Sequence, residues 1–294
     1  MKALVIAERA DAARDLCAGA RTLAGEVVLV SFGGAPQAVA DKVVNVSVPE
    51  GAVLDDAADT VISVFNAEQP GLVLVEPTRH MKTIAGRLAA HAGTSVITDV
   101  VEFTAEGAKS LYFGGVAERV RKPKAGTALC TVTPGSFEEA VASGADTVEE
   151  VAWIAPANPS KLVSSTPIEK SGVDLFKADA VVACGRGFAE ESDLDLARVL
   201  CDKLGAGLAC SRPLTEGMNW LPTEAYVGVS GLMLSPKVYV ACGISGQMQH
   251  MVGCNRSGAV FAINKDRNAP IFKQCDYGLV GDVKDVLPAL TDAL

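Results

Sequence analysis

Residues 238–250 read VYVACGISGQMQH, and this stretch decides the fold. A short apolar run is typical of a strand, and the two glycines that follow make a turn before a helical stretch. In open α/β sheets, ligands bind beyond the carboxyl ends of strands, where such turns let the backbone approach a phosphate. We therefore predict that the amides of Ser245 to Met248 face an anion, with Gln249 and His250 one turn further on.

Three more glycine-rich turns are predicted in the same half of the chain, each after a short apolar or aromatic run. They are Gly185-Arg186-Gly187, Gly228-Val229-Ser230-Gly231 and Gly278-Leu279-Val280-Gly281-Asp282. One such turn is weak evidence, whereas four within roughly 100 residues favour a nucleotide site over tight packing alone. The turn after residue 242 is not G-x-G-x-x-G, so the ordinary NAD fingerprint is absent.

The first half of the chain alternates between apolar runs and helical stretches. The expected strands are Leu4–Ala7, Val27–Ser31, Val43–Val48, Gly71–Val75 and Ser95–Val101, and the expected helices are Asp11–Ala24, Ala57–Glu68 and Met81–Ala92. This alternation predicts an open parallel sheet with helices on both faces. From Leu111 to Val132 the runs become short and are separated by Gly114-Gly115 and Lys122-Pro123-Lys124, which indicates antiparallel hairpin strands at the edge.

A linker is expected where two stretches rich in Pro and Ser, residues 155–160 and 164–167, carry few apolar anchors. A new strand begins at Ala180. The sequence thus predicts two α/β domains, each a mainly parallel sheet flanked by helices. Residues 1–167 form a nucleotide-binding-like domain, and residues 168–294 form a smaller flavodoxin- or Rossmann-like domain.

The composition of the 294 residues agrees with such a protein, because 49% are hydrophobic and only 5% are aromatic. The net charge of −9 argues against a nucleic-acid partner, since a polyanion would be repelled. The first apolar run is short and followed at once by Glu8 and Arg9, unlike a signal peptide. No apolar run approaches the roughly 18–20 residues of a membrane span. We expect a soluble, cytoplasmic protein without membrane insertion.

The eight cysteines are scattered without a C-x-x-C pair, and several, such as Cys184 and Cys242, lie inside apolar runs. This distribution predicts buried free thiols in a reducing compartment, and no zinc or iron–sulfur site. No pair of residues marks an acid–base catalytic centre either. We expect no metal and no catalytic residues.

Three segments of the second half, Tyr239–His250, Ala262–Phe272 and Asp276–Asp282, keep a distinctive order and spacing. Together they resemble the FAD-binding signature of electron-transfer flavoprotein alpha subunits. Cys184–Gly187 and Cys210–Pro213 match the same family, and Leu111–Gly115 and Thr131–Phe137 resemble its first domain more loosely. The runs at residues 231–236 and 246–253 favour the branch linked to anaerobic carnitine-type and related enoyl-CoA metabolism.

The resemblance implies roles for individual side chains. Arg212 would lie against the isoalloxazine, where a permanent cation favours the negatively charged reduced forms of the ring. His250 would donate to the O2 edge of the flavin, Ser230 would hydrogen-bond N5, and Ser211 would support the ring or the ribityl chain. Arg186 would pair with the pyrophosphate, which the amides of residues 245–249 would cap.

At the other end of the cofactor, Asn264 and Asp282 would take the adenosine ribose and nearby hydroxyls. Without the resemblance, turn or cap roles are equally good for these two residues, and a lone Arg or His is more often structural or exposed. The full set of expected FAD-binding residues is Arg186, Ser211, Arg212, Val227, Gly228, Val229, Ser230, Ser245, Gly246, Gln247, Met248, Gln249, His250, Asn264, Asp282 and Val283.

Two details qualify this site. The family often has Gln where Val229 stands, so a typical redox potential is not expected. Lys265, Asp266 and Arg267 are interpreted as a solvated loop outside the site, although family members use this region near the nucleotide.

The function that the resemblance implies is that of an electron carrier without substrate turnover of its own. It would hold FAD in the second domain, bind an electron-transfer flavoprotein beta subunit through the first, and exchange electrons with an acyl-CoA dehydrogenase or reductase. The first domain's own nucleotide pocket is expected to be empty. The alternatives are an alpha subunit of an electron-bifurcating flavoprotein, an NAD-binding enzyme on the same sheet topology, and a flavin-free scaffold subunit. The sequence leaves the redox partner and the direction of electron flow open.

Overall fold

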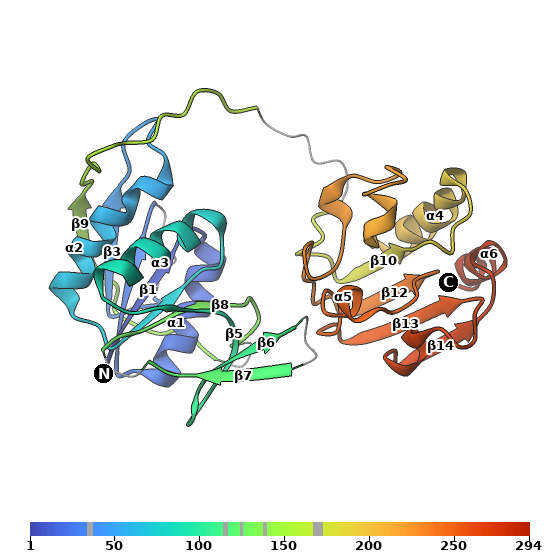
Figure 1. Ribbon diagram of the computed structural model, residues 1–294, viewed down its shortest axis with the longest axis horizontal. Helices are drawn as coiled ribbons and strands as arrows, with labels where there is room; N and C mark the ends of the chain where they lie inside the picture. Colours follow the sequence, from blue (N-terminus) through green and yellow to red (C-terminus); the bar gives the residue numbers. More distant parts are fainter. Residues whose placement is uncertain (34–37, 114–116, 124–125, 138–139, 167–172) are drawn as a thin grey trace. The chain divides into compact units, whose positions relative to one another are not determined.

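The computed structural model describes residues 1–33, 38–113, 117–123, 126–137, 140–166 and 173–294. They divide into two compact units, one made of Met1–Tyr112 and Ala117–Pro167 and the other mainly of Ile168–Leu294. The predicted fold class is confirmed, since the first unit contains a nine-stranded, mostly parallel sheet and the second a five-stranded parallel sheet (Figure 1). The domain boundary expected near Pro167 lies outside the described residues and stays a prediction.

The sheet of the first unit is built from strands spread over residues 2–152. They are β1 (Lys2–Ala7), β2 (Glu26–Ser31), β3 (Lys42–Ser47), β4 (Leu72–Val75), β5 (Val96–Thr104), β6 (Gly107–Tyr112), β7 (Ala117–Arg121), β8 (Ala128–Val132) and β9 (Thr147–Ala152). Their order is β7-β6-β5-β8-β4-β1-β2-β3-β9. Because β2 and β3 lie on one side of β1 and β4 on the other, the topological switch point is between β1 and β4.

Helices cover both faces of this sheet. The helix α1 (Ala10–Leu23) packs on one face, and η1 (Leu54–Ala57), α2 (Ala58–Glu68) and α3 (Arg79–His91) pack on the other. Successive side chains of a strand point to opposite faces. In β1, Ala3 and Val5 therefore face α1, whereas Leu4 and Ile6 face α2 and α3, and all four are completely buried.

The segment from Leu111 to Val132 differs in part from the prediction. Strands β6 and β7 pair antiparallel at the sheet edge as expected. Strand β8 instead runs parallel and lies between β4 and β5, so its interpretation as an edge strand was wrong. Both faces of β8 are covered, with Leu129 and Cys130 buried on opposite sides, and an unbroken apolar run of this kind is typical of a central parallel strand.

A buried carboxylate closes the switch point of the first unit. Glu76 follows β4 directly and is completely buried. It accepts hydrogen bonds from the backbone N–H groups of Glu8 (2.8 Å) and Arg9 (3.1 Å), where β1 gives way to α1. It also forms an ion pair with the Arg9 guanidinium. An acidic side chain of the chain itself thus satisfies the amides at this turn.

The first part of the predicted linker is attached to the first unit. The N–H of Ile154 donates to Oγ1 of the buried Thr60 at 2.9 Å. Further on, the N–H and Oγ of Ser160 bind the carboxylate of Asp56, at 2.5 and 3.2 Å. The chain is therefore attached to the first unit at Ile154 and at Ser160, on either side of a Pro-rich stretch.

The second unit has the strand order of flavodoxin-like folds. Its strands are β10 (Ala180–Cys184), β11 (Gly207–Cys210), β12 (Val238–Cys242), β13 (Ala259–Asn264) and β14 (Tyr277–Val280). They are all parallel, in the order β11-β10-β12-β13-β14. With β11 on one side of β10 and β12 on the other, the switch point is between β10 and β12.

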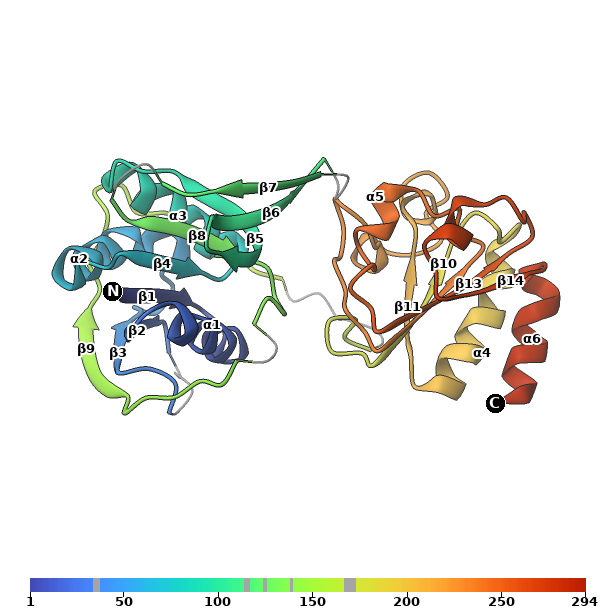
Figure 2. The same ribbon diagram turned by 90° about the horizontal axis from the view of Figure 1, so that it is seen from below.

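Helices α4 (Leu194–Leu204) and α6 (Val283–Ala293) lie side by side on one face of this sheet (Figure 2). The short helix α5 (Met248–Met251) packs on the other face, through Met251. Single 3-10 turns complete the unit, namely η2 (Glu191–Asp193), η3 (Arg212–Leu214), η4 (Thr223–Ala225) and η5 (Pro270–Lys273). The faces of β12 differ accordingly, with Val240 and Cys242 toward α4 and α6 and Tyr239 and Ala241 toward α5.

All eight cysteines are free thiols, seven of them buried, as predicted; Cys275 is half-buried. Burial raises the pKa of six of them to about 12, namely Cys17, Cys130, Cys201, Cys210, Cys242 and Cys254. Within the described residues, the helices are too short or too polar to cross a membrane.

Candidate functional site

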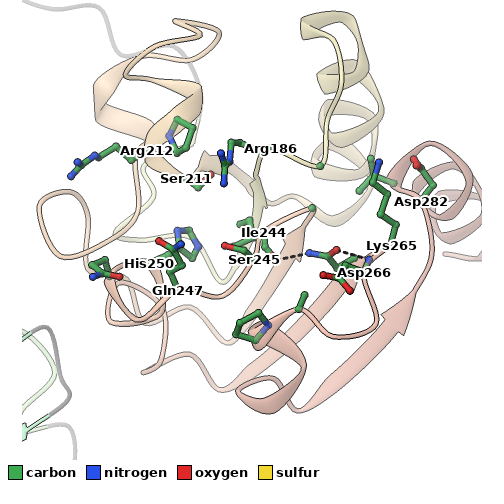
Figure 3. Close-up of a pocket in the computed structure, with 18 of the residues that line it drawn as sticks. Arg186, Ser211, Arg212, Ile244, Ser245, Gln247, His250, Lys265, Asp266 and Asp282 are labelled. Atoms are coloured by element: carbon green, nitrogen blue, oxygen red, sulfur yellow. Dashed lines mark hydrogen bonds between the residues drawn. The ribbon is translucent and has the colours of Figure 1, made fainter.

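A cleft of about 670 Å³ opens beyond the carboxyl ends of β10, β11, β12 and β13. Residues that follow these strands line it, among them Arg186 after β10, Ser211 after β11, Ser245 after β12 and Lys265 after β13 (Figure 3). The carboxyl ends of neighbouring parallel strands meet at one edge of a sheet, which brings these separate loops together. The volume is within the range of cofactor sites, about 300–1,000 Å³.

The turns after β10 and β12 pack backbone against backbone below the cleft. The N–H of Gly185 donates to Cys242 O, and the N–H of Gly187 to Gly243 O, each at 2.9 Å. A side chain on Gly243 would bring its Cβ to 2.6 Å from the Cα of Gly187, and its φ of +64° is also strained for other residues. These glycines are thus required for tight packing, and the same packing forms the floor of a cleft.

Three successive carbonyl groups after β12 are held from the side of β13 and η5. The hydrogen bonds run from Asn264 Nδ2 to Ile244 O (2.8 Å), from Ile271 N to Ser245 O (3.0 Å) and from Gln274 Nε2 to Gly246 O (2.8 Å). The N–H groups of residues 245–247, by contrast, donate to no group in the described part of the chain. Unpaired successive amides at a cleft are suited to bind an anion.

His250 is a buried histidine at the cleft. It follows the turn within α5, is 7% exposed, and its Nε2 lies 3.0 Å from Tyr239 Oη. Its Nδ1 is buried. Burial lowers the pKa of His250 to about 4, against the raising effect of a hydrogen bond with the Val227 backbone beside the ring, so the imidazole is neutral near pH 7. The ring therefore lies between the Tyr239 hydroxyl and the Val227 backbone, as a buried neutral group at the cleft.

The two arginines of the expected site are both exposed and both line the cleft. Arg212 pairs with Glu216, with 3.2 Å between Nε and Oε2, and extends away from the other labelled side chains in Figure 3. Arg186 lies beside Ser211. Together with Lys265 they give the cleft three cations, which suits a ligand with a negatively charged group.

Asn264 and Asp282 combine a structural role with a place in the cleft lining. Asn264 holds Ile244 O, and its Oδ1 also accepts from Asp266 N at 2.9 Å. Asp282 caps α6, where its Oδ1 accepts from Lys284 N at 3.0 Å. Asn264 therefore has a turn role and Asp282 a cap role, and both residues also line the cleft, where a ligand can contact them.

The structure gathers only part of the expected set around the cleft. Those that line it are Arg186, Ser211, Arg212, Ser245, Gln247, Gln249, His250, Asn264, Asp282 and Val283, and those that do not are Val227, Gly228, Val229, Ser230, Gly246 and Met248. The turn at residues 227–231 lies against α5, since Val229 N donates to Gln249 O at 2.8 Å. Ser230 reaches the cleft only through Tyr226, with 3.4 Å between the hydroxyl oxygens.

Several residues line the cleft that the sequence did not point to, including Tyr226, Ile244, Lys265 and Asp266. Lys265 and Asp266 are exposed, as expected of a loop, but they follow β13 directly and also line the cleft. Their position after a strand was the signal for this place in the lining, and their exclusion from the FAD site stays a prediction. Tyr226 gave no such signal, because it follows η4 instead of a regular strand.

The fourth glycine-rich segment is not a turn throughout. Gly278 lies inside β14, and only Gly281 and Asp282 lead out of the strand to α6. A Cβ on Gly278 would lie 2.5 Å from Cδ1 of Phe272. This glycine therefore lets an aromatic ring pack on the strand, and its interpretation as part of a ligand-binding turn was wrong.

Comparison with known proteins agrees with this site. A family model described as "Electron transfer flavoprotein domain" matches residues 3–157, more than half of the chain, and one described as "Electron transfer flavoprotein FAD-binding domain" matches residues 174–255. "Protein FixB" of Escherichia coli O127:H6 is 41% identical over 256 residues, which cover 84% of this chain and 81% of that protein. "Protein FixB" of Shigella dysenteriae serotype 1 matches with the same identity and coverage.

The residues of the cleft fit FAD on two observations. The unpaired amides of residues 245–247 and the exposed Arg186 suit a diphosphate, and the cleft volume of about 670 Å³ suits a cofactor-sized ligand. The chain therefore belongs to the electron-transfer flavoprotein family, as an alpha-type member that binds FAD.

Proposed function

We propose that this chain is the alpha subunit of a heterodimeric electron carrier, which receives electrons from one redox protein and delivers them to another. The observation that carries the proposal is that one cleft combines unpaired backbone amides, the exposed Arg186 and the buried, neutral His250. FAD, when bound, supplies the one- and two-electron chemistry that the side chains of the cleft do not supply themselves.

The side chains divide the proposed site into two ends. The amides of residues 245–247 and Arg186 hold the diphosphate, and Asn264 and Asp282 face the adenosine part. At the other end, His250 and Ser211 contact the ring system, and Arg212 turns from Glu216 toward it. A fixed positive charge and a neutral donor there both favour added electrons, because they stabilise negative charge on a ring. Ser230 contacts Tyr226 in the cleft lining, Val229 N donates to Gln249 O, and the Val227 backbone lies beside His250.

The proposed partners follow from the family. An electron-transfer flavoprotein beta subunit binds the first unit, and the redox partner is an acyl-CoA dehydrogenase or reductase of the anaerobic carnitine-type or a related enoyl-CoA branch. The 41% identity to the FixB proteins and the match of the first unit to the family support this assignment. Buried free thiols suit a reducing compartment, which supports a cytoplasmic location.

The test is to purify the full chain together with the product of the adjacent gene and to analyse the bound cofactor. We expect a yellow heterodimer with one FAD per alpha chain. Arg186→Gln should weaken FAD binding about tenfold through the loss of a charged contact to the diphosphate, about 1.4 kcal/mol. Arg198→Gln is the matched control, because this exposed arginine on α4 pairs with Asp195 and does not line the cleft.

Three outcomes would contradict the proposal. A colourless heterodimer would support a scaffold subunit or an NAD-binding enzyme. FMN in place of FAD would remove the need for a diphosphate site. A second FAD in the heterodimer would instead favour the bifurcating alternative while leaving the alpha-chain site as proposed.

A further inference from the structure

Tyr226 and His250 supply the aromatic rings among the described residues that line the cleft. The backbone of Tyr226 pairs with Cys210 at the end of β11, where Val227 N donates to Cys210 O at 2.9 Å. Ser211, the next residue of the chain after Cys210, also lines the cleft, and the Val227 backbone lies beside the His250 ring. Tyr226 therefore lies at the same end of the cleft as Ser211 and His250.

The glycine-rich turn that follows Tyr226 is packed around its ring. A Cβ on Gly231 would lie 2.5 Å from Tyr226 Cδ1 and 2.9 Å from Cε1, and a Cβ on Gly228 would lie 2.8 Å from Tyr226 Oη. Side chains do not approach so closely, so the ring fits because both residues are glycine. Ser230 Oγ lies 3.4 Å from the same hydroxyl oxygen. The turn therefore fixes the position of the Tyr226 ring.

This packing encloses Tyr226 but keeps it in the lining of the cleft. The residue is 5% exposed, and Leu232 N donates to its backbone O at 2.7 Å. The nearby lining residues Ser211 and Gln249 have short or polar side chains, so Tyr226 supplies the larger apolar surface at this end. A planar aromatic ligand packs favourably on such a ring, offset or edge to face.

We propose that Tyr226 is the aromatic contact of the flavin ring, and that the turn at residues 228–231 holds this side chain in place. The inference rests on the proposed function, which puts the ring system of FAD at the end of the cleft with Ser211 and His250. Two of the four glycine-rich turns then serve different purposes: the turn after β12 offers amides to a ligand, and the turn after Tyr226 makes room for an aromatic side chain of the protein.

Flavin fluorescence of the purified heterodimer tests this contact. An excited flavin that touches a tyrosine ring takes an electron from it and returns it at once, which quenches the emission without a net reaction. Tyr226→Leu removes the aromatic ring and keeps an apolar side chain, so the emission per bound FAD should rise several-fold. Tyr277→Leu is the matched control, because this tyrosine on β14 is 63% exposed and does not line the cleft.

Affinity for FAD provides a second readout. Tyr226→Leu should weaken binding about fivefold, or about 1 kcal/mol. Tyr226→Phe keeps the ring and should restore most of the affinity. A merely structural role would lower the stability of the flavin-free protein and its affinity together, but it would leave the emission of the bound FAD unchanged. Unchanged emission of Tyr226→Leu, or equal losses of affinity for the Phe and Leu variants, would overturn the inference.

A measurement on the wild type keeps the inference testable should Tyr226→Leu not fold. The chain has four tyrosines, so 3-fluorotyrosine labelling gives four ¹⁹F signals, which single Tyr→Phe variants assign. The Tyr226 signal should shift on addition of FAD to the flavin-free heterodimer, and the Tyr277 signal should not. A Tyr226 signal that FAD leaves in place would overturn the contact.

The outcomes separate this inference from the proposed function. A wild-type heterodimer that binds no FAD would overturn the function. A heterodimer that binds FAD, with emission and ¹⁹F signals that do not depend on Tyr226, would overturn the role of Tyr226 alone.

Discussion

Each unit has a switch point at the carboxyl edge of its sheet, but the backbone amides there are paired in the first unit and unpaired in the second. At the switch point between β1 and β4, the buried Glu76 carboxylate satisfies the amides of Glu8 and Arg9. At the switch point between β10 and β12, the amides of residues 245–247 have no partner in the described part of the chain, and a cleft lies over them. One edge contains its own anion, and the other is built to receive one.

This difference shows that the same position in two sheets, the switch point, can be filled by a side chain of the protein or left open for a ligand. At the open edge, the carbonyls of the turn after β12 are held by residues of β13 and η5 and by Gln274, while its amides stay unpaired among the described residues. At the closed edge, a single acidic residue of the chain completes the hydrogen bonds of the amides. In the proposed function, the first unit acts through its surface, as a platform for the beta subunit.

The largest expected effect comes from opening the closed edge. Glu76→Ala leaves two amides and the Arg9 guanidinium without their buried partner, and should lower the free energy of unfolding of the first unit by about 3 kcal/mol. Urea unfolding in a Trp220→Phe background isolates this unit, because Trp153 is then the only tryptophan. FAD binding by the second unit should not change.

A phosphate titration sharpens this experiment. If the freed amides resemble those of the open edge, inorganic phosphate should stabilise the Glu76→Ala variant and leave the wild type unaffected. Glu50→Ala, at an exposed position, is the control. A loss for Glu76→Ala no greater than for Glu50→Ala would remove the contrast between the two edges.

The next effect concerns pH and only the second unit. Unfolded His250 takes up a proton below about pH 6.5, whereas the folded residue has its pKa lowered to about 4. Between these values the unfolded state holds more protons, so stability falls as the pH falls. At pH 5 the flavin-free protein should have lost about 2 kcal/mol that His250→Gln retains.

Urea unfolding followed through Trp220, in a Trp153→Phe background, measures this loss. Parallel pH curves for the wild type and His250→Gln would show that His250 is not buried as a neutral group. The first unit, followed through Trp153, should give the same curve in both proteins.

The smallest effect tests the support behind the open edge. Gln274→Ala removes one of the three hydrogen bonds to the turn after β12 and should weaken FAD binding about fivefold, close to 1 kcal/mol. Isothermal titration of the flavin-free protein measures the change. The neighbouring Lys273→Ala should bind FAD like the wild type, and equal losses for both variants would deny Gln274 a specific role.

The sequence predicted correctly those strands and turns that depend only on neighbouring residues in the chain. Apolar runs ending in glycine located β10 and β12, and parallel pairing then placed Arg186 and Ser245 at one edge. It was insufficient where distant segments meet. Glu76 resembles any acid after a strand, and its burial depends on residues 67 and 68 positions earlier.

The errors have the same physical origin. Strand β8 follows a hairpin in the chain, but the sheet inserts it between β4 and β5. Neither Gln274 nor Tyr226 follows a predicted strand directly. Tertiary packing brings Gln274 to the turn after β12 and Tyr226 to the cleft. Neither residue has a local pattern that distinguishes it from an exposed polar residue or a core aromatic.

The buried cysteines have a consequence for the fate of electrons in this protein. A thiol reacts with oxidants as the thiolate. Cys242 directly precedes Gly243 in the cleft lining, and burial raises the pKa of its thiol to about 12. Only on the order of one such group in 10⁵ is therefore ionised at pH 7. The Cys242 sulfur is thus protected from oxidation through its thiolate, although it lies next to the cleft that is proposed to hold a redox cofactor.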